Sequence, residues 1–203
     1  ESDSQYSYDG LDKFPAFINP LLRYTLFRRG PFTSNIAEGG AFFKTNSDLP
    51  AADFQILFAP ATFIKHGRMK LGSHTGFTMG ACHLQPKSRG TVKLKNKSLS
   101  AAPIIDPNYM SAKEDREALV KGFKFIQDIL YTEPLNNYIK KAKFPTKKLE
   151  KSDEILDFLR TYIQTLYHPV GTCRMGLDLE SVVDQKLKVR GVSGLRVVDA
   201  SVM

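Results

Sequence analysis

The chain has 203 residues, enough for one or two domains with a buried core that needs no disulfide support. Apolar residues make up 42% of it and charged residues 25%, a balance that excludes a disordered or collagen-like protein. The formal net charge of +8 permits binding to a polyanion without requiring it. Two cysteines, Cys82 and Cys173, are too few for a disulfide framework. The longest stretch low in charge, near residues 56–64, is far shorter than the ~20 residues of a membrane span, so we expect no membrane helix.

The two ends of the sequence do not resemble natural termini. The chain begins Glu1-Ser2-Asp3-Ser4, without an initiator methionine or a signal-peptide pattern. It stops at Met203, shortly after the apolar run of residues 195–198. We therefore expect this chain to be a piece of a longer protein.

The first half of the chain predicts a few short elements. Residues 1–50 are rich in aromatic side chains and predict irregular structure, with one short helix near residues 20–27. The apolar pattern predicts three strands, from about residue 53, over about residues 76–84, and over residues 91–95, where Val92 and Leu94 alternate with polar residues. Residues 86–90 have the composition of a turn, so we expect a hairpin between the last two strands and antiparallel pairing.

Two helices are predicted in the second half. Ser111 and Glu114 have the spacing of a capping box, which marks a helix start. The apolar residues that follow recur at helical spacing and define one buried face: Leu119, Phe123, Ile126 and Leu130. A second helix should begin near Ser152 or Asp153, with its buried side formed by Ile155, Leu159, Tyr162 and Leu166. Short β-like pieces are expected near residues 187–189 and 195–198.

The strongest candidate site lies in residues 167–176. Pro169 disfavours the helical conformation at His168, so we expect this imidazole at a helix end, turned toward a cleft. Gly171 and Thr172 would let a planar ligand approach the backbone closely. Spacing alone leaves a second interpretation open, in which His168 is a structural histidine.

Several collinear segments resemble one enzyme family. The segments HPVGTCRMG at residues 168–176, Val183-Asp184, and RGVSGLRVVDAS at residues 190–201 resemble the C-terminal signature of the glucose–methanol–choline (GMC) oxidoreductases. Earlier segments resemble landmarks of that family's substrate domain in the same order: GPFTSNIAEGGAF at 30–42, PKSRG at 86–90 and IDPNY at 105–109. The resemblance covers about residues 30–203 and is nearest to the animal glucose dehydrogenase-like branch.

The resemblance implies an α+β fold for most of the chain. An antiparallel sheet covered by helices would form a substrate-binding domain over residues 1–165. Residues 166–203 would return to an FAD-binding α/β domain that is incomplete here, and residues 195–198 would be an exposed strand without its neighbours. The family's N-terminal Gly-x-Gly-x-x-Gly loop does not occur in this sequence, and its second active-site residue, a His or Asn, would lie beyond Met203. We therefore expect this chain alone neither to bind FAD tightly nor to turn over.

The resemblance also implies a flavoenzyme that oxidises a small alcohol or sugar by hydride transfer to FAD, with oxygen or a quinone as electron acceptor. His168 matches the family's active-site histidine and would accept the substrate's hydroxyl proton. The expected cofactor-binding residues are Asp199, Ala200, Gly171 and Thr172. Glu38 would line the substrate cavity, with a plain surface position as its alternative. The compartment stays open, and the resemblance favours export.

Other site chemistries are less well supported by the sequence. His66, His74, Cys82 and His83 are close in sequence but lack the spacing of a zinc site, so we expect no metal. Cys173 has a histidine near it, but no orienting acid that would make it a nucleophile.

A basic connector suggests a different class of function. Residues 140–151 carry a cluster of lysines, which would suit a module that binds nucleic acid or another polyanion. Only Phe144 is interleaved with them and Pro145 breaks the periodicity, so a solvated loop is favoured and no nucleic acid is expected. An inactive flavoprotein homologue remains the third alternative.

Overall fold

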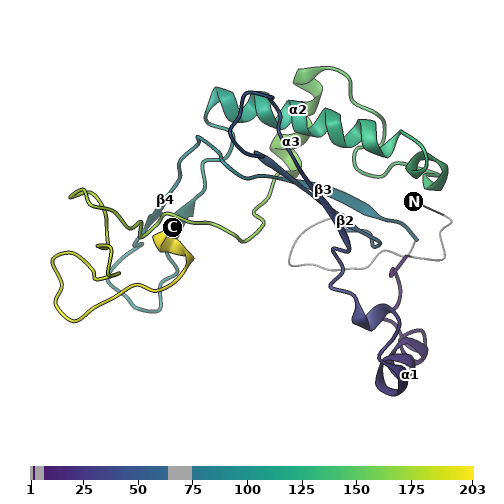
Figure 1. The fold of residues 1–203 in the computed structure, drawn as a ribbon, viewed down its shortest axis with the longest axis horizontal. Coiled ribbons are helices and arrows are strands. Elements are labelled where there is room, and N and C mark those ends of the chain that lie inside the picture. The colour runs from purple at the N-terminus through teal and green to yellow at the C-terminus, as the bar shows by residue number, and fades with distance from the viewer. Residues whose placement is uncertain (1, 3–6, 64–74) are drawn as a thin grey trace. The chain divides into compact units, whose positions relative to one another are not determined.

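The computed structural model describes residues 2, 7–63 and 75–203, and these divide into two compact units (Figure 1). The first unit comprises residues 1–87 and 112–162, and the second comprises residues 88–111 and 163–203. Residues 88–111 thus group with the C-terminal segment. The expected assignment of residues 1–165 and 166–203 to two domains of a longer enzyme stays a prediction.

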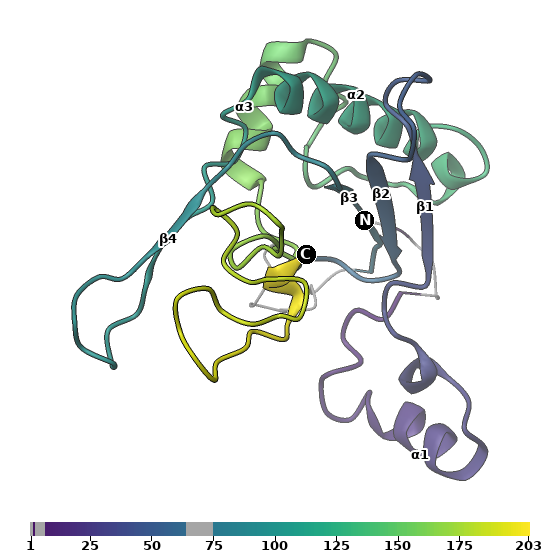
Figure 2. The ribbon, with the colours of Figure 1, turned by 60° about the vertical axis from the view of Figure 1, so that its left-hand side comes forward.

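A three-stranded antiparallel sheet forms the centre of the first unit (Figure 2). Its strands are β1 (Gly39–Phe43), β2 (Phe54–Ala59) and β3 (Thr78–His83), in that order across the sheet. The alternation that predicted β2 is confirmed, because Phe54 and Ile56 are buried there. The expectation of irregular structure is wrong for residues 39–43, which pair with β2 as an edge strand.

The long helix α2 (Lys113–Leu130) packs on a row of aromatic rings that crosses the sheet. Phe43 and His83 are the cross-strand neighbours of Phe54 on either side. Their rings lie 5.4 Å and 5.0 Å from the Phe54 ring, and Phe125 of α2 lies 4.3 Å from Phe43. Gly122 of α2 leaves no room for a side chain above Phe54, because a Cβ there would lie 2.5 Å from the ring. This close approach sets the distance between α2 and the sheet.

The second helix, α3 (Ser152–Tyr162), packs on α2 through a small apolar core. Val120, Leu149 and Ile155 form its buried centre. Partly buried apolar residues surround it: Phe123, Leu156, Phe158 and Leu159. The predicted buried faces are confirmed in part: Phe123, Ile155 and Leu159 lie in this core and Ile126 is buried. Tyr162 is exposed, and α3 ends before Leu166.

The predicted capping box at the start of α2 is wrong. Ala112 is the N-cap residue, and no side chain caps the helix there. Two acidic residues in the first turn, Glu114 and Asp115, instead complement the partial positive charge of the helix N-terminus. Asp115 is buried and accepts a 2.7 Å hydrogen bond from the backbone N–H of Lys87, which ties the chain after β3 to α2.

The N-terminal part of the first unit contains a short helix, α1 (Ile18–Phe27), close to the predicted one. Figure 2 shows α1 at the end of the sheet away from α2. Leu22, Leu26 and Phe27 are exposed on it. Within the described part of the chain, every helix is too short or too polar to cross a membrane.

The second unit contains a separate two-stranded sheet, formed by β4 (Thr91–Lys93) and β5 (Ile104–Asp106). The expected hairpin between the strands at 76–84 and 91–95 is therefore wrong, because β3 pairs with β2 and β4 pairs with β5. The alternation of Val92 and Leu94 does not mark a buried face, since Leu94 is 87% exposed. The backbone of Gly90 passes so close to the carbonyl of Asp106 that a Cβ would lie 2.1 Å from its oxygen.

The last forty residues form hydrogen-bonded loops with isolated bridges between them. Residues 187–189 pair antiparallel with residues 195–197: the N–H of Val189 donates to Leu195 O at 3.0 Å, and that of Val197 to Leu187 O at 3.1 Å. The expected strand at residues 195–198 is thus reduced to a single antiparallel bridge, between Arg196 and Lys188 of the same segment. The absence of its neighbours from an FAD domain stays a prediction. Leu195 and Val198 are exposed.

Candidate functional site

His168 lies in an irregular segment of the second unit and not at a helix end, because α3 stops at Tyr162. Tyr167 has a positive φ of 62°, which turns the chain sharply before the histidine. The His168 side chain is exposed, and no protein group within the described residues binds its imidazole by a hydrogen bond. The imidazole is therefore open to contact by a ligand.

The segment that follows His168 runs alongside the end of the chain. The N–H of Cys173 donates to Ser201 O at 2.9 Å, and the N–H of Met175 donates to Val202 O at 2.8 Å. Gly171 has a φ of 88°, and a Cβ on it would lie 3.8 Å from Met203 O. The fold therefore brings Gly171 and Thr172 together with the turn that carries Asp199 and Ala200.

Asp199 caps that turn, the 3-10 helix η3 (Ala200–Val202). Its Oδ1 accepts hydrogen bonds from the backbone N–H of Ser201, at 2.8 Å, and from the Ser201 hydroxyl. These two bonds hold the pKa of Asp199 below its ordinary value, and the bond from the hydroxyl has the larger effect. Its carboxylate is exposed and charged at neutral pH, and Ala200 beside it is exposed as well.

A network of polar side chains holds the turn between these two segments. Arg174 and Asp178 form a bidentate pair, with distances of 2.9 Å from Nη1 to Oδ2 and 2.6 Å from Nη2 to Oδ1. The Arg174 guanidinium holds the pKa of Asp178 well below its usual range. Arg190 donates through Nε to Ser181 Oγ at 3.0 Å and through Nη2 to Gly176 O at 2.8 Å.

Sequence reasoning missed this network as a functional element. The spacing of four between Arg174 and Asp178 was a usable signal for an ion pair. Ser181 and Arg190 are nine residues apart in irregular chain, and no periodicity relates them.

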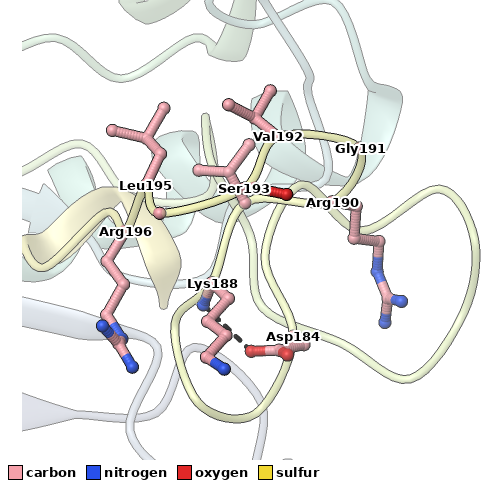
Figure 3. Close-up of a pocket in the computed structure, with 10 residues that line it drawn as sticks. Asp184, Lys188, Arg190, Gly191, Val192, Ser193, Leu195 and Arg196 are labelled. Atoms are coloured by element: carbon pink, nitrogen blue, oxygen red, sulfur yellow. Dashed lines mark hydrogen bonds between the residues drawn. The ribbon is translucent and has the colours of Figure 1, made fainter.

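A shallow depression of about 650 Å³ lies in the same unit and is lined by Asp184 and residues 188–196 (Figure 3). Gly191 and Gly194 both have positive φ and form its two sharp corners. Val192 and Leu195 point to one side of this loop, whereas Lys188 and Asp184 lie on the other (Figure 3). The Asp184 carboxylate accepts N–H bonds from Lys188 at 2.9 Å and Lys186 at 2.8 Å, and these bonds lower its pKa. The Asp184 carboxylate thus stabilises the loop through these backbone bonds.

Glu38 lies in the first unit, directly before β1, and its side chain is exposed. The Tyr8 hydroxyl donates to Glu38 Oε1 at 2.5 Å. A hydrogen bond from Ser34, and to a smaller extent one from Tyr8, lowers the pKa of Glu38. Burial, together with the Glu38 carboxylate, raises the pKa of Tyr8. This arrangement holds the carboxylate in place as an anion at the surface of the first unit.

The residues of the metal hypothesis are only partly described. His66 and His74 lie outside the described residues. Within the described ranges, no three His, Cys, Asp or Glu side chains come together in a way that could hold a metal ion. His83 instead stacks on Phe54, and burial lowers its pKa more than the nearby carboxylates of Asp115 and Asp53 raise it. Cys82 and Cys173 are free thiols.

Part of the lysine-rich connector is matched by acidic neighbours. Lys148 Nζ lies 3.4 Å from Asp128 Oδ1 and 3.9 Å from Glu150 Oε1. It also lies 5.9 Å from the centre of the Tyr131 ring. These contacts suit a surface loop packed against α2.

Comparisons with known proteins identify relatives over most of the chain. An alcohol dehydrogenase (acceptor) of Pseudomonas putida is 41% identical over 189 residues, which are 93% of this chain and 34% of that protein. An oxygen-dependent choline dehydrogenase of Acinetobacter baumannii is 35% identical over 84% of this chain and 31% of its own length. The chain thus spans about a third of the length of the curated relatives it matches.

The fold comparison agrees with the sequence relatives. A formate oxidase of Aspergillus oryzae RIB40, studied for the modification of its FAD, matches with a TM-score of 0.81 at 24% identity. The match covers 95% of this chain and 38% of the oxidase, and it supports the expected α+β fold. The profile of the GMC oxidoreductase family matches residues 86–203, more than half of the sequence. This chain therefore belongs to the GMC oxidoreductases, a family of FAD-dependent enzymes.

Proposed function

We propose that the protein to which this chain belongs oxidises the CH–OH group of a small alcohol or sugar, with FAD as hydride acceptor and oxygen or a quinone as final acceptor. The names of the alcohol and choline dehydrogenase relatives support this substrate class. The observation that carries the proposal is the pairing of the His168 segment with the chain end, through Cys173 to Ser201 and Met175 to Val202.

The residues along this pairing fit a flat, polar cofactor. Gly171, Thr172, Asp199 and Ala200 are exposed, and Gly171 presents no side chain in the way of a ring. No hydrogen bond from another described residue engages the Thr172 hydroxyl, so it is available to a ligand. These four residues would hold FAD, which supplies the two-electron acceptor when bound. Gly171 would allow close approach, Thr172 would offer a hydrogen bond, and the charged Asp199 would fix the η3 turn.

His168 would act on the substrate hydroxyl. One ring nitrogen accepts the hydroxyl proton while the C–H bond is oxidised, which stabilises the alkoxide character that develops on the oxygen. Proton acceptance of this kind contributes about 10²–10⁴ in rate. Glu38, oriented by Tyr8 and Ser34, is the candidate substrate-binding carboxylate, and it would favour a cationic or hydroxyl-rich substrate.

The test is a His168→Asn substitution in the full-length protein, assayed with a panel of alcohols, choline and sugars. We expect kcat to fall by about 10²–10⁴, while the flavin absorbance spectrum is retained. His83→Asn removes an imidazole from the first unit and controls for the loss of a histidine. Because His83 stacks on Phe54, its unfolding is measured alongside, and the folded variant should keep a kcat close to wild type. An unchanged kcat in His168→Asn would show that this imidazole takes no part in the reaction. Absence of oxidation of any CH–OH substrate by the flavin-loaded wild type would refute the activity itself.

A second measurement concerns the chain by itself. Because the chain lacks a Gly-x-Gly-x-x-Gly loop, we expect residues 1–203 alone to show neither a bound-flavin spectrum nor alcohol-dependent dye reduction. A stable flavin complex of this chain would contradict that expectation.

A further inference from the structure

Arg190 occupies a central place in the turn between the two segments of the candidate site. Its guanidinium spans two acceptors, Ser181 Oγ at 3.0 Å and Gly176 O at 2.8 Å. Its own backbone N–H donates to Val182 O at 3.0 Å. Arg190 therefore holds both sides of the turn that runs from Gly176 to Val182.

Ser181 passes this constraint into the turn. It is buried, and its hydroxyl lies within hydrogen-bond distance of Asp178 O, at 2.6 Å, and of Gly176 O, at 3.0 Å. A hydroxyl that accepts from Arg190 still has one proton to donate to either carbonyl. Gly176 lies close to Ser181, because a Cβ at Gly176 would be 3.0 Å from Ser181 Cβ.

The turn is connected directly to the candidate site. Gly176 donates to Val183 O at 3.2 Å and Val182 donates to Arg174 O at 3.0 Å, so the turn fixes the position of residues 174–176. Those residues continue into the pairing of Cys173 and Met175 with Ser201 and Val202. A displacement of residues 176–182 would therefore shift Gly171 and Thr172 relative to Asp199 and η3.

Few other contacts could hold this arrangement. Ser181 and Val183 are the two buried residues of the second unit, all of whose residues the structure describes. The unit thus has no sizeable apolar core, and its geometry depends on hydrogen bonds. A guanidinium suits the task because its planar fork donates in two fixed directions, which a lysine ammonium does not reproduce.

We propose that Arg190 is a positioning residue, which sets the register between the His168 segment and the Asp199 turn through Ser181 and Gly176. The proposal rests on the function proposed above, and it adds a residue that touches neither substrate nor cofactor.

The experiment compares Arg190→Gln, Arg190→Lys and Arg196→Gln in the full-length, flavin-loaded protein. Arg196 is the matched control, because its Nε donates to a backbone oxygen, that of Lys186, outside the turn. We expect Arg190→Gln to speed hydrogen exchange of the Cys173 and Met175 amides about tenfold. We also expect kcat to fall about 10- to 100-fold, because small misplacements of reacting groups are costly, with KM and flavin content nearly unchanged. Arg190→Lys should recover part of both effects, and Arg196→Gln should show neither.

A further variant, at Ser181, tests the same contact from its other side. Ser181→Ala removes the Nε acceptor and should shift exchange and kcat in the same direction as Arg190→Gln. The double variant should lose less than the sum of the two single variants, because both substitutions break the Arg190–Ser181 bond, and a fully additive loss would overturn the proposal. So would equal exchange and kcat in Arg190→Gln and Arg196→Gln. Failure of the proposed function appears separately, as a wild type without activity, and the exchange measurement then still decides the role of Arg190.

Discussion

Replacing Gly122 with alanine should destabilise the first unit, because the new methyl group would overlap a ring that has nowhere to go. The Cβ would lie 2.5 Å from Phe54 Cε1 and 2.9 Å from Cδ1 and Cζ, against the roughly 3.5–4.0 Å at which carbon atoms meet favourably. Phe54 is fully buried between the rings of Phe43 and His83. Relief therefore requires α2 to move away from the sheet.

The magnitude follows from two opposing terms. Overpacking of a core by one methyl group costs about 1–3 kcal/mol, whereas Gly→Ala inside a helix gains about 1 kcal/mol in propensity. With a contact this short, we place the overpacking cost in the upper part of its range, so unfolding should become easier by about 1–2 kcal/mol. For a protein of this size that corresponds to a fall in Tm of about 2–8 °C.

Thermal and urea unfolding followed by circular dichroism measure this effect. Gly80→Ala is the matched control, because a Cβ on that β3 glycine has no neighbour within 4 Å, and its Tm should be unchanged or slightly raised. Adding Phe54→Leu to Gly122→Ala should restore part of the loss, as a favourable coupling in a double-mutant cycle. A Gly122→Ala protein as stable as wild type would show that α2 does not rest on Phe54 in this way.

Two further substitutions test the polar ties of each unit. Gln127→Ala should lower the free energy of unfolding by about 2–4 kcal/mol in a urea titration, because each orphaned buried group costs about 1–3 kcal/mol. The buried Gln127 amide both donates to Leu149 O at 2.9 Å and accepts from Leu149 N at 2.8 Å. Arg174→Gln should raise the pKa of Asp178 toward its ordinary value near 3.8, measured by NMR titration of the carboxyl carbon. Because the ion pair lowers the pKa of Asp178, the pair stabilises the fold fully when the pH is above the ordinary pKa of an aspartate, and this stabilisation is lost as the pH falls below that pKa. If the substitution left the titration of Asp178 unchanged, the ion pair would be excluded in solution.

Periodicity predicted the elements whose apolar faces are buried within one unit. The alternation through Phe54 and Ile56 and the spacing of Phe123 and Ile126 correspond to a sheet and a helix that cover each other. β1 escaped notice because Gly39 and Gly40 disfavour a strand, and because it is stabilised by its pairing to β2 rather than by a buried face of its own. Elements of this kind depend on a partner that no local pattern shows.

Pairing partners were the least predictable part of the fold. β4 was expected to continue the sheet after β3, yet it pairs with β5 across a loop of ten residues, and the two strands share no buried side chain. The candidate site shows the same limit. Resemblance could single out His168, Gly171 and Asp199, but the hydrogen bonds that align their segments join backbone atoms, which residue identity does not encode.

The two units hold their candidate residues by different physical means, and this difference separates the effects of substitution. In the first unit, Glu38 precedes a strand of a sheet that packs on α2, so damage to that packing should appear first as lost stability. In the second unit, Gly171 and Asp199 are carried by loops whose only buried members are Ser181 and Val183. Breaking one hydrogen bond there removes little buried apolar area, so Tm should change little, but it releases a segment whose position no core restores. Substitutions around Arg190 should therefore change kcat and local hydrogen exchange while the unfolding transition of the first unit stays in place.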